Sequence, residues 1–247
     1  MQEYKFEKTI KISFPECDAQ NKIKLSNVLR HIGDMGEEHL DALSLPYKRL
    51  WDEGFVFLLT RIGMRITRMP CAMEQLRLVT KARASKGVQM MREVSFYDVN
   101  GSELIFVQTA WVLANPFTHK IYRPRAFPHQ IPLEPDHEDC YDLVKGHLRR
   151  PENAALLGTR IVRYSDIDCN MHMNNAVYAD VIADFLPLKM HSERELCECH
   201  IAFVGEVKLG DKMELYGAST DSDSYYVGAD RPEKDRCFDA VLKFKAL

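Results

Sequence analysis

The chain has 247 residues, of which 46% are hydrophobic and 28% are charged, and its formal net charge is -3. This composition predicts a soluble globular protein that can bury one large core or two small ones. No basic excess is present to hold phosphates, so we expect no nucleic-acid partner.

The ends and the cysteines indicate a compartment. The first residues mix acidic and basic side chains, including Glu3 and Lys5, which is unlike a signal or transit peptide. No apolar run approaches the length of a membrane span, so we expect no membrane insertion. The seven cysteines are scattered and odd in number, which predicts free thiols in the cytoplasm. Cys197 and Cys199 lack partners that would complete a zinc site, so we expect neither metal nor cofactor.

The first half of the chain predicts a strand, a loop, a helix and then a run of strands. Polarity alternates over residues 4–14, a polar loop covers 15–24, and apolar residues recur at helical spacing over 25–43. Asn100-Gly101 is a strong hairpin signal between two of the later strands. The four strand-like runs lie approximately at 55–69, 76–85, 89–99 and 103–115.

The second half repeats this pattern after a proline-rich segment over residues 124–153, which has weak periodicity. A strand is predicted at 157–164, a polar loop at 165–173, and a helix at 175–185 with Asn174 as its N-cap. Strand-like runs then follow at 198–204, 213–219, 225–230 and 237–244.

The repeated order predicts the fold class. Consecutive strands with short turns pair antiparallel, and an apolar helix must bury one face against the sheet they form. We therefore predict an α+β protein with two tandem domains, each a curled antiparallel sheet wrapped around a central helix. The predicted boundaries are an N-terminal domain over 1–128, a linker over 129–156 and a C-terminal domain over 157–247.

A polar stretch over residues 164–178 aligns without a gap with residues 14–28. The later copy contains Asp168, Asn170 and His172, whereas the earlier copy keeps the frame and has no imidazole. If the loop is extended, these three alternate side chains share one face. The asymmetry predicts a duplicated domain in which only the second copy performs chemistry.

A simpler interpretation of the same stretch is an Asx-rich turn that caps a helix. The earlier copy makes the same strand-to-helix turn with Lys22 in place of His172 and Leu25 in place of Asn175. Capping alone therefore does not require the imidazole or the Asn174-Asn175 pair, and this comparison favours a functional site.

Two stretches, residues 163–175 and 110–123, together with a looser match at 58–62, carry a resemblance to a known family. The sequence resembles the acyl-[acyl-carrier-protein] (acyl-ACP) thioesterases, plant-plastid and bacterial enzymes with two tandem hotdog domains. The Asp-x-Asn-x-His run occurs widely among hotdog thioesterases. Its combination with the tandem order and the stretch around Trp111 makes the match more specific. The resemblance implies hydrolysis of acyl-ACP to free fatty acid in fatty acid biosynthesis.

In this family a downstream acid completes the site, after an aromatic residue and two further positions. Phe203 and Glu206 fit that pattern. Plant members often have a cysteine after the acid, and Val207 here excludes a cysteine nucleophile at that position. Cys169, inside the motif, is expected to be structural. An alignment of strands places Thr67 near Glu206, so the first copy is expected to lack the second carboxylate as well.

The residues present suit direct hydrolysis of a thioester. Glu206 or Asp168 would activate water, and the two remain alternatives, while Asn170 and His172 would bind the thioester and the leaving thiolate. The helix that starts at Asn175 would offer N–H groups and a positive dipole end to the oxyanion. The substrate-binding residues assigned to this domain are Asn174 and Asn175.

By resemblance, the first domain holds the acyl chain, and Trp51, Phe55 and Phe57 are its candidate contacts. Core packing is the competing explanation for most of these side chains. The partner implied is an acyl carrier protein bearing an acyl-phosphopantetheine, bound by a monomer or a homodimer. Basic residues near the junction either form a solvated connector or steer that acidic carrier. They are Lys145, Arg149, Arg150, Arg160 and Arg163.

Three other activities compete with this prediction. An acyl-CoA thioesterase would use the same catalytic residues, because both carriers present the phosphopantetheine arm. A non-catalytic acyl-thioester or lipid-binding module is disfavoured by the joint presence of the imidazole, the amide and two acids. A hotdog dehydratase would place its histidine and acid in a different motif context.

Overall fold

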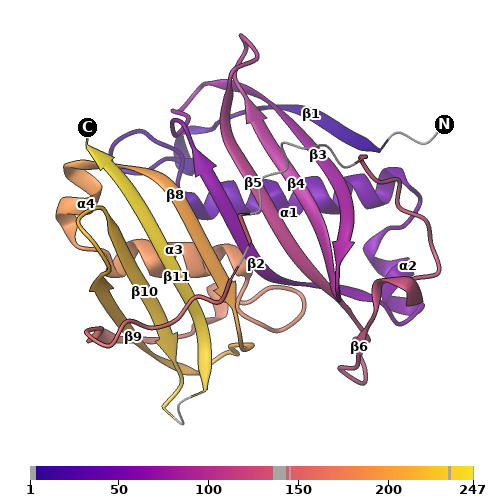
Figure 1. The fold of residues 1–247 in the computed structure, drawn as a ribbon. Helices are drawn as coiled ribbons and strands as arrows, with labels where there is room; N and C mark the ends of the chain where they lie inside the picture. Colours follow the sequence, from indigo (N-terminus) through magenta and orange to yellow (C-terminus); the bar gives the residue numbers. More distant parts are fainter. Residues whose placement is uncertain (1–3, 136–142, 145, 233–234, 247) are drawn as a thin grey trace. The chain divides into compact units, whose positions relative to one another are not determined.

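The computed structural model describes residues 1–247 except 1–3, 136–142, 145, 233–234 and 247 (Figure 1). The chain divides into two compact units. The first unit consists of residues 1–23 and 30–144, and the second unit of residues 24–29 and 145–247. Each is described by itself below.

The first unit is built on an antiparallel sheet in which every neighbouring pair of strands runs in opposite directions. Its strands, in spatial order, are β1 (Lys5–Lys11), β3 (Gln75–Lys86), β4 (Gln89–Tyr97), β5 (Glu103–Ala114) and β2 (Val56–Ile66), with the short β6 (Ile121–Tyr122) paired to β5. Its helices are α1 (Leu25–Ala42), of which residues 30–42 belong to this unit, and α2 (Tyr47–Asp52).

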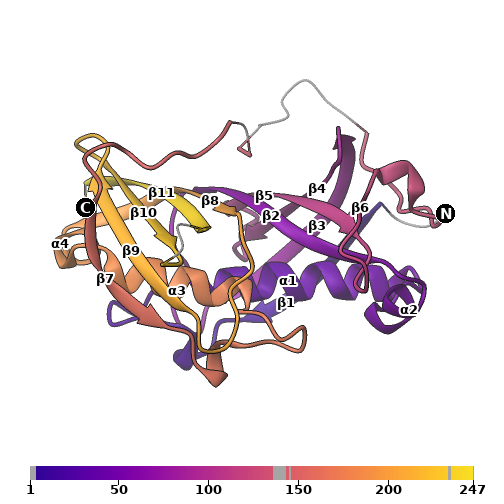
Figure 2. The ribbon, with the colours of Figure 1, turned by 90° about the horizontal axis from the view of Figure 1, so that it is seen from below.

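Helix α1 lies across one face of this sheet (Figure 2). Ile32, Met35 and Leu40 recur at helical spacing and are at most 6% exposed, so the apolar stripe of the helix is its buried face. His39 on the same helix contacts Arg92 of β4, with 3.0 Å between Nδ1 and Nη1. The helix predicted over 25–43 is confirmed within one residue.

The second unit repeats this architecture with its own sheet. Its strands, in spatial order, are β8 (Arg194–Phe203), β11 (Arg236–Ala246), β10 (Ser224–Asp230), β9 (Lys212–Ser219) and β7 (Ala155–Ile161), and its helices are α3 (Asn175–Phe185) and α4 (Leu188–Ser192). Tyr178 of α3 packs edge-on against Phe203 of β8 and Phe238 of β11, with ring centroids 5.2 and 5.4 Å apart. The prediction of two α+β domains, each a sheet with a helix against it, is confirmed.

The elements that the sequence analysis missed are short. Helices α2 and α4 have 6 and 5 residues, too few for a 3.6-residue period to be visible. Each has a proline at its N-cap position, Pro46 for α2 and Pro187 for α4.

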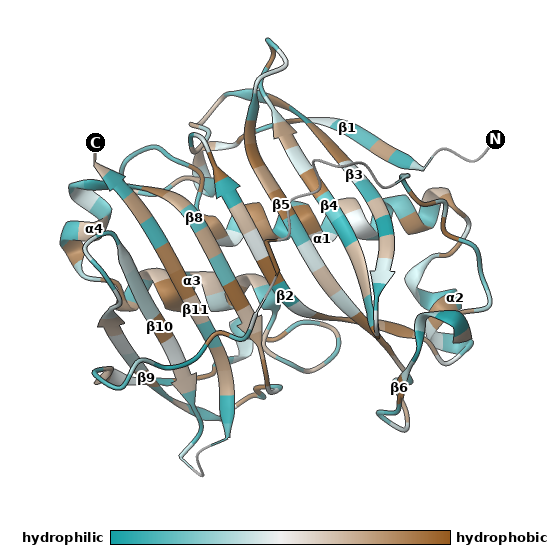
Figure 3. Cartoon of the chain, viewed as in Figure 1, coloured by the Kyte–Doolittle hydropathy of each residue, from teal (hydrophilic) through white to brown (hydrophobic). Residues whose placement is uncertain are grey.

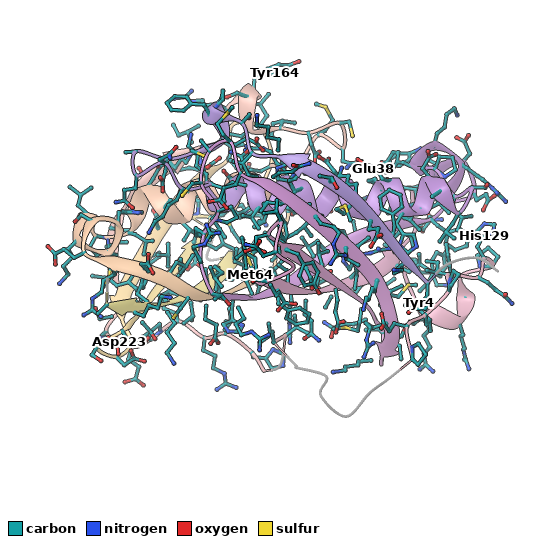
Figure 4. The ribbon with its side chains drawn as sticks, turned by 90° about the horizontal axis from the view of Figure 1, so that it is seen from above. Tyr4, Glu38, Met64, His129, Tyr164 and Asp223 are labelled. Carbon is teal, nitrogen blue, oxygen red and sulfur yellow. The ribbon has the colours of Figure 1, made fainter. Side chains whose placement is uncertain are left out.

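Hydrophilic and hydrophobic residues are interspersed along the strands (Figure 3). Met64 of β2 is fully buried in the first unit, whereas Tyr164, before α3, is 84% exposed and points outward (Figure 4). None of the described helices is both long and apolar enough to cross a bilayer. The six cysteines in the described part of the chain are all free thiols.

Part of the predicted linker packs on the sheet of the first unit. The Glu134 N–H donates to the Ala82 carbonyl at 2.9 Å, and the Glu134 carboxylate pairs with Lys81 at 2.8 Å. Further along, Leu143 lies so close to Gly63 of β2 that a Cβ at residue 63 would fall 2.3 Å from the Leu143 carbonyl oxygen. Gly63 is therefore required by contact rather than by its backbone angles.

Replacing Gly63 with alanine should lower the free energy of unfolding by about 1–3 kcal/mol, because the linker must move away from β2. Thermal or urea unfolding measures the change. A Cβ added at Gly33 in α1 would meet no atom within 4 Å, so Gly33→Ala is the matched control and should stabilise the protein by about 0.5–1 kcal/mol. Equal effects of the two substitutions would contradict this packing.

Candidate active site in the second unit

The loop before α3 is a tight turn rather than an extended segment. The Asp168 N–H donates to the His172 carbonyl at 3.0 Å, and the Met171 N–H donates to the Asp168 carbonyl at 3.0 Å. Met171 has a φ of 64°, in the left-handed region. The extended loop that would place Asp168, Asn170 and His172 on one face is therefore not formed, because the chain reverses between them.

Asp168 is turned toward its own loop. Its Oδ1 accepts the backbone N–H of Asn170 at 2.8 Å, which is an Asx-turn. The Asn170 and Cys169 side chains are exposed at the tip of the turn. The structure thus brings Asp168 and Asn170 together through the backbone, and the carboxylate stabilises the turn that carries His172.

A main-chain connection brings the turn beside the segment after β8. His172 forms an antiparallel bridge with Lys208, and the Met173 N–H donates to the Val207 carbonyl at 2.8 Å. This register places the His172 Nε2 3.1 Å from the Glu206 Oε2. The two side chains are 28% and 45% exposed, so an acid and an imidazole meet where a substrate can reach them.

The backbone of Glu206 is held from both sides. The N–H groups of Val204 and Gly205 both donate to the Cys237 carbonyl, at 2.9 and 3.1 Å. A Cβ on Gly205 would lie 2.7 Å from the carbonyl oxygen of Arg236, so only glycine permits this approach. The Glu206 carbonyl in turn accepts from Arg231 at 3.3 Å.

Asp166 is a site-organising residue that the sequence analysis did not identify. It is 6% exposed and accepts the Arg163 N–H and the Arg160 guanidinium, each at 2.8 Å. Its carbonyl accepts the Asn174 N–H at 2.9 Å, which connects the turn to the helix start. The signal was present in the internal alignment, because an acid, Glu16, occupies the same position in the first copy.

Asn174 caps α3, as predicted. Its Oδ1 accepts the Ala176 N–H at 2.9 Å, and its carbonyl accepts the Val177 N–H at 2.9 Å. Two N–H groups that the sequence analysis offered to an oxyanion are thus engaged by the cap. The N–H of Asn175 takes part in neither bond, so it is the backbone donor that the cap leaves for a ligand at this helix end.

Tyr178 lies one turn into α3 and is buried against the sheet. Burial raises the pKa of its hydroxyl, and the nearby Cys237 and Glu206 act in the same direction. Tyr178 therefore stays neutral at physiological pH and forms an apolar floor under this end of the helix.

The first copy has the same backbone frame. The Asp18 N–H donates to the Lys22 carbonyl at 2.8 Å, the Gln20 N–H donates to the Asp18 Oδ1 at 2.9 Å, and Asn21 has a φ of 60°. The Ile23 N–H donates to the Pro70 carbonyl at 2.8 Å, which matches the bond from Met173 to Val207. The two loops are thus one turn with different side chains.

This register refines one alignment made from sequence. Pro70 corresponds to Val207, so the residue that corresponds to Glu206 is Met69, two positions after Thr67. Residue spacing along a long strand does not show which positions correspond, whereas the hydrogen bond from Ile23 to Pro70 fixes the register. The first copy still has neither an imidazole nor a carboxylate at these two positions.

The aromatic candidates in the first unit are packed against one another. Phe55 and Phe57 both contact Phe127, with ring centroids 5.7 and 5.4 Å apart, and Trp51 packs edge-on against Phe117 at 5.6 Å. Phe55 and Phe57 also cover a cluster of buried leucines that consists of Leu40, Leu45 and Leu50. These contacts give them a core role, and their contact with an acyl chain stays a prediction.

Two of the five basic residues near the junction take part in local ion pairs. Arg150 stacks over the Tyr216 ring at 3.7 Å and pairs with Asp230 at 2.7 Å, and Arg160 pairs with Asp166. Lys145 lies outside the described residues. Arg149 and Arg163 are exposed, so they are the members available to an acidic carrier.

Within the described residues, no group of three or more His, Cys, Asp or Glu side chains is arranged to hold a metal ion.

Comparison with known proteins identifies the family. The model of the acyl-ACP thioesterase N-terminal domain matches residues 3–125, and that of the C-terminal domain matches residues 152–231. The chain belongs to the acyl-ACP thioesterase family. Similar proteins include the acyl-[acyl-carrier-protein] hydrolase FATB2 of Cuphea viscosissima, 21% identical over 80% of this chain and 51% of that protein. The palmitoyl-acyl carrier protein thioesterase of Cuphea hookeriana is 20% identical over 90% and 56%, so the chain spans about half the length of these relatives.

Solved structures of the family share the tandem hotdog fold. The 12:0-ACP thioesterase from Umbellularia californica matches with a TM-score of 0.88 and 14% identity, over 100% of this chain and 96% of that one. An acyl-ACP thioesterase from Bacteroides thetaiotaomicron matches with a TM-score of 0.86 and 17% identity, over 98% of both chains. The fold predicted for this thioesterase family member is confirmed.

Substituting Asn174 with alanine should lower the free energy of unfolding by about 1 kcal/mol, because the Ala176 N–H loses its acceptor. Asn174→Asp keeps an acceptor oxygen and should restore most of that loss. Urea denaturation of the two variants beside Asn175→Ala measures the effect. Equal stabilities for Asn174→Ala and Asn174→Asp would show that the cap contributes nothing.

Proposed function

We propose that the protein is an acyl-ACP thioesterase that hydrolyses the thioester and releases free fatty acid in the cytoplasm. The observation that carries the proposal is the 3.1 Å approach of His172 to Glu206 in the second unit. The first copy keeps the same turn and has Lys22 and Met69 at these positions. A purely structural role for the turn would not require the difference.

Glu206 is the stronger candidate for the general base. Asp168 uses Oδ1 to accept the Asn170 N–H, whereas the Glu206 carboxylate is 45% exposed beside His172. We assign Glu206 the task of taking a proton from water as the water oxygen bonds to the thioester carbonyl carbon. The N–H of Asn175 and the side chain of Asn170 would bind the carbonyl oxygen as charge develops on it.

The tetrahedral intermediate then collapses with cleavage of the carbon–sulfur bond. The proton held by Glu206 passes to the imidazole across the 3.1 Å separation, and His172 then donates a proton to the leaving sulfur and returns to its neutral form. Atoms balance without a covalent enzyme intermediate, since water supplies the oxygen of the acid. Val207 after the acid is consistent with this route, because no thiol stands at that position.

The substrate assignment rests on the family. The named relatives are hydrolases of acyl-ACP, and we assign this chain the same carrier, with the first unit holding the acyl chain. Arg149 and Arg163 supply exposed positive charge for an acidic carrier. The predicted domain boundaries, the monomeric or homodimeric state and the cytoplasmic location belong to this proposal. The free thiols of the described residues favour a reducing compartment.

Replacing Glu206 with glutamine should reduce kcat for acyl-ACP by about 10²–10⁴-fold, because the amide cannot accept the proton. Single-turnover hydrolysis, followed by mass spectrometry of the released acid, measures the step directly. Glu198→Gln is the matched control, since Glu198 forms a second His–Glu pair in the same unit, with His200 of β8. Its activity should equal that of the wild type.

Wild-type turnover by Glu206→Gln would end the assignment of the base. Hydrolysis of acyl-CoA with a kcat/KM equal to or above that for acyl-ACP would replace the carrier in the proposal. Failure of the wild type to hydrolyse either thioester would leave a non-catalytic acyl-binding protein as the function.

Asp168 should act through position rather than charge. Asp168→Asn keeps an oxygen for the Asn170 N–H and should retain most of the wild-type kcat, whereas Asp168→Ala should lose more because the turn loosens. Asp18→Ala removes the corresponding bond of the first copy and is the control for a general loss of stability. Steady-state kinetics measures kcat for each variant. Equal loss of kcat in both Asp168 variants would contradict the positional role and make the Asp168 carboxylate a candidate for the general base again.

A further inference from the structure

A buried polar pair inside the first unit combines a charged guanidinium with a buried ring nitrogen that has no hydrogen-bond partner among the described residues. Arg92 of β4 is 8% exposed, and His39 of α1 is 2% exposed. The Arg92 Nη1 donates to the His39 Nδ1 at 3.0 Å and to the Thr80 Oγ1 at 2.9 Å. Phe6 of β1 stacks on the imidazole, with ring centroids 6.0 Å apart.

The charge of Arg92 has no carboxylate in contact with it among the described residues. Burial lowers the Arg92 pKa to about 10, which still leaves the guanidinium charged at neutral pH. Glu37 acts on it through space only and has a raised pKa of its own, chiefly because of burial. A buried charge that lacks a direct partner is costly, so a fold that retains one calls for an explanation.

The tautomer of His39 follows from its neighbour. Burial and the adjacent Arg92 charge lower the His39 pKa to about 4, so the imidazole is neutral at physiological pH. A guanidinium only donates, so Nδ1 must accept and the ring proton must be on Nε2. That Nε2–H is buried and has no acceptor in the described part of the chain.

The hydroxyl groups beside this pair, in contrast to the His39 Nε2–H, have hydrogen-bond partners. The Thr80 hydroxyl donates to the Glu93 carbonyl at 3.0 Å while it accepts from Arg92. The Thr109 hydroxyl donates to the Arg92 carbonyl at 3.2 Å and accepts from the Trp111 Nε1 at 2.8 Å. The His39 Nε2–H is therefore a donor to which none of these neighbouring groups supplies an acceptor oxygen.

We propose that Arg92 and His39 bind an acceptor oxygen carried on the acyl chain away from the thioester, either a hydroxyl or a carboxylate. The inference rests on the proposed function, in which the first unit holds the acyl chain. A carboxylate is the stronger ligand, because it neutralises the buried guanidinium as well as accepting its hydrogen bonds. The protein would then select oxygen-bearing acyl chains over unsubstituted chains of equal length.

The test compares kcat/KM for acyl-ACPs of equal carbon number that end in a methyl, an ω-hydroxyl or an ω-carboxyl group, over a panel of chain lengths. The wild type should prefer an oxygen-bearing chain at the length that reaches the pair. Arg92→Met should reduce that preference about tenfold or more and leave or raise turnover of the methyl-ended chain. His39→Phe, which keeps the ring on Phe6, should reduce the preference by a smaller factor.

Arg83→Met is the matched control. Arg83 is a buried arginine of β3, 5% exposed, and is paired with Glu93 at 3.6 Å. Its loss should lower thermal stability without changing the preference among chains. A structural role for Arg92 would change turnover of all three chains alike, which would overturn the inference.

Equal turnover of all three chain types by the wild type, at every length, would also overturn the inference. An ordered water molecule would then be the acceptor for Arg92 and His39. If the wild type hydrolyses no acyl-ACP, the proposed function fails separately. Calorimetric titration with free ω-hydroxy and ω-carboxy acids against plain fatty acids then tests the pair. Tighter binding of the oxygen-bearing acids that is lost in Arg92→Met supports the inference, and equal binding contradicts it.

Discussion

The hydrogen bond from the Met173 N–H to the Val207 carbonyl sets the geometry on which the candidate site depends. It joins the start of α3 to the segment after β8, in which Glu206 directly precedes Val207. In this antiparallel register His172 pairs with Lys208, and its side chain lies diagonally across from Glu206, with 3.1 Å between Nε2 and the Glu206 Oε2. Gly205 completes the constraint, because a larger residue would push the segment away from Arg236.

The two copies share one backbone turn, and only the second copy has the imidazole and the acid. The bond from Ile23 to Pro70 repeats the constraint in the first copy, where Lys22 and Met69 take the positions of the imidazole and the acid. The first copy does not have to position an imidazole and an acid, so the interior of its unit can be adapted to a ligand. The buried charge of Arg92 and the unpartnered Nε2–H of His39 lie in that interior.

Much of the fold could be predicted from the sequence, because the apolar period of α1 and α3 and the alternation of the strands are strong local signals. The helix over 175–185 and its Asn174 cap are set by residues that lie next to each other in the chain, so pattern alone located them. The reversal of the loop at Met171 was missed, because a left-handed residue other than glycine leaves little trace in sequence. The meeting of His172 with Glu206 depends on register between distant segments, which only the family pattern indicated.

The central claim is that His172 and Glu206 act as one catalytic unit. A double-mutant cycle measures this directly, with single-turnover rates for wild type, His172→Gln, Glu206→Gln and the double variant on one acyl-ACP. If the pair works together, the double variant will be about as slow as the slower single variant. If the losses in the two single variants instead multiply in the double variant, the residues act independently and the account of the site is wrong.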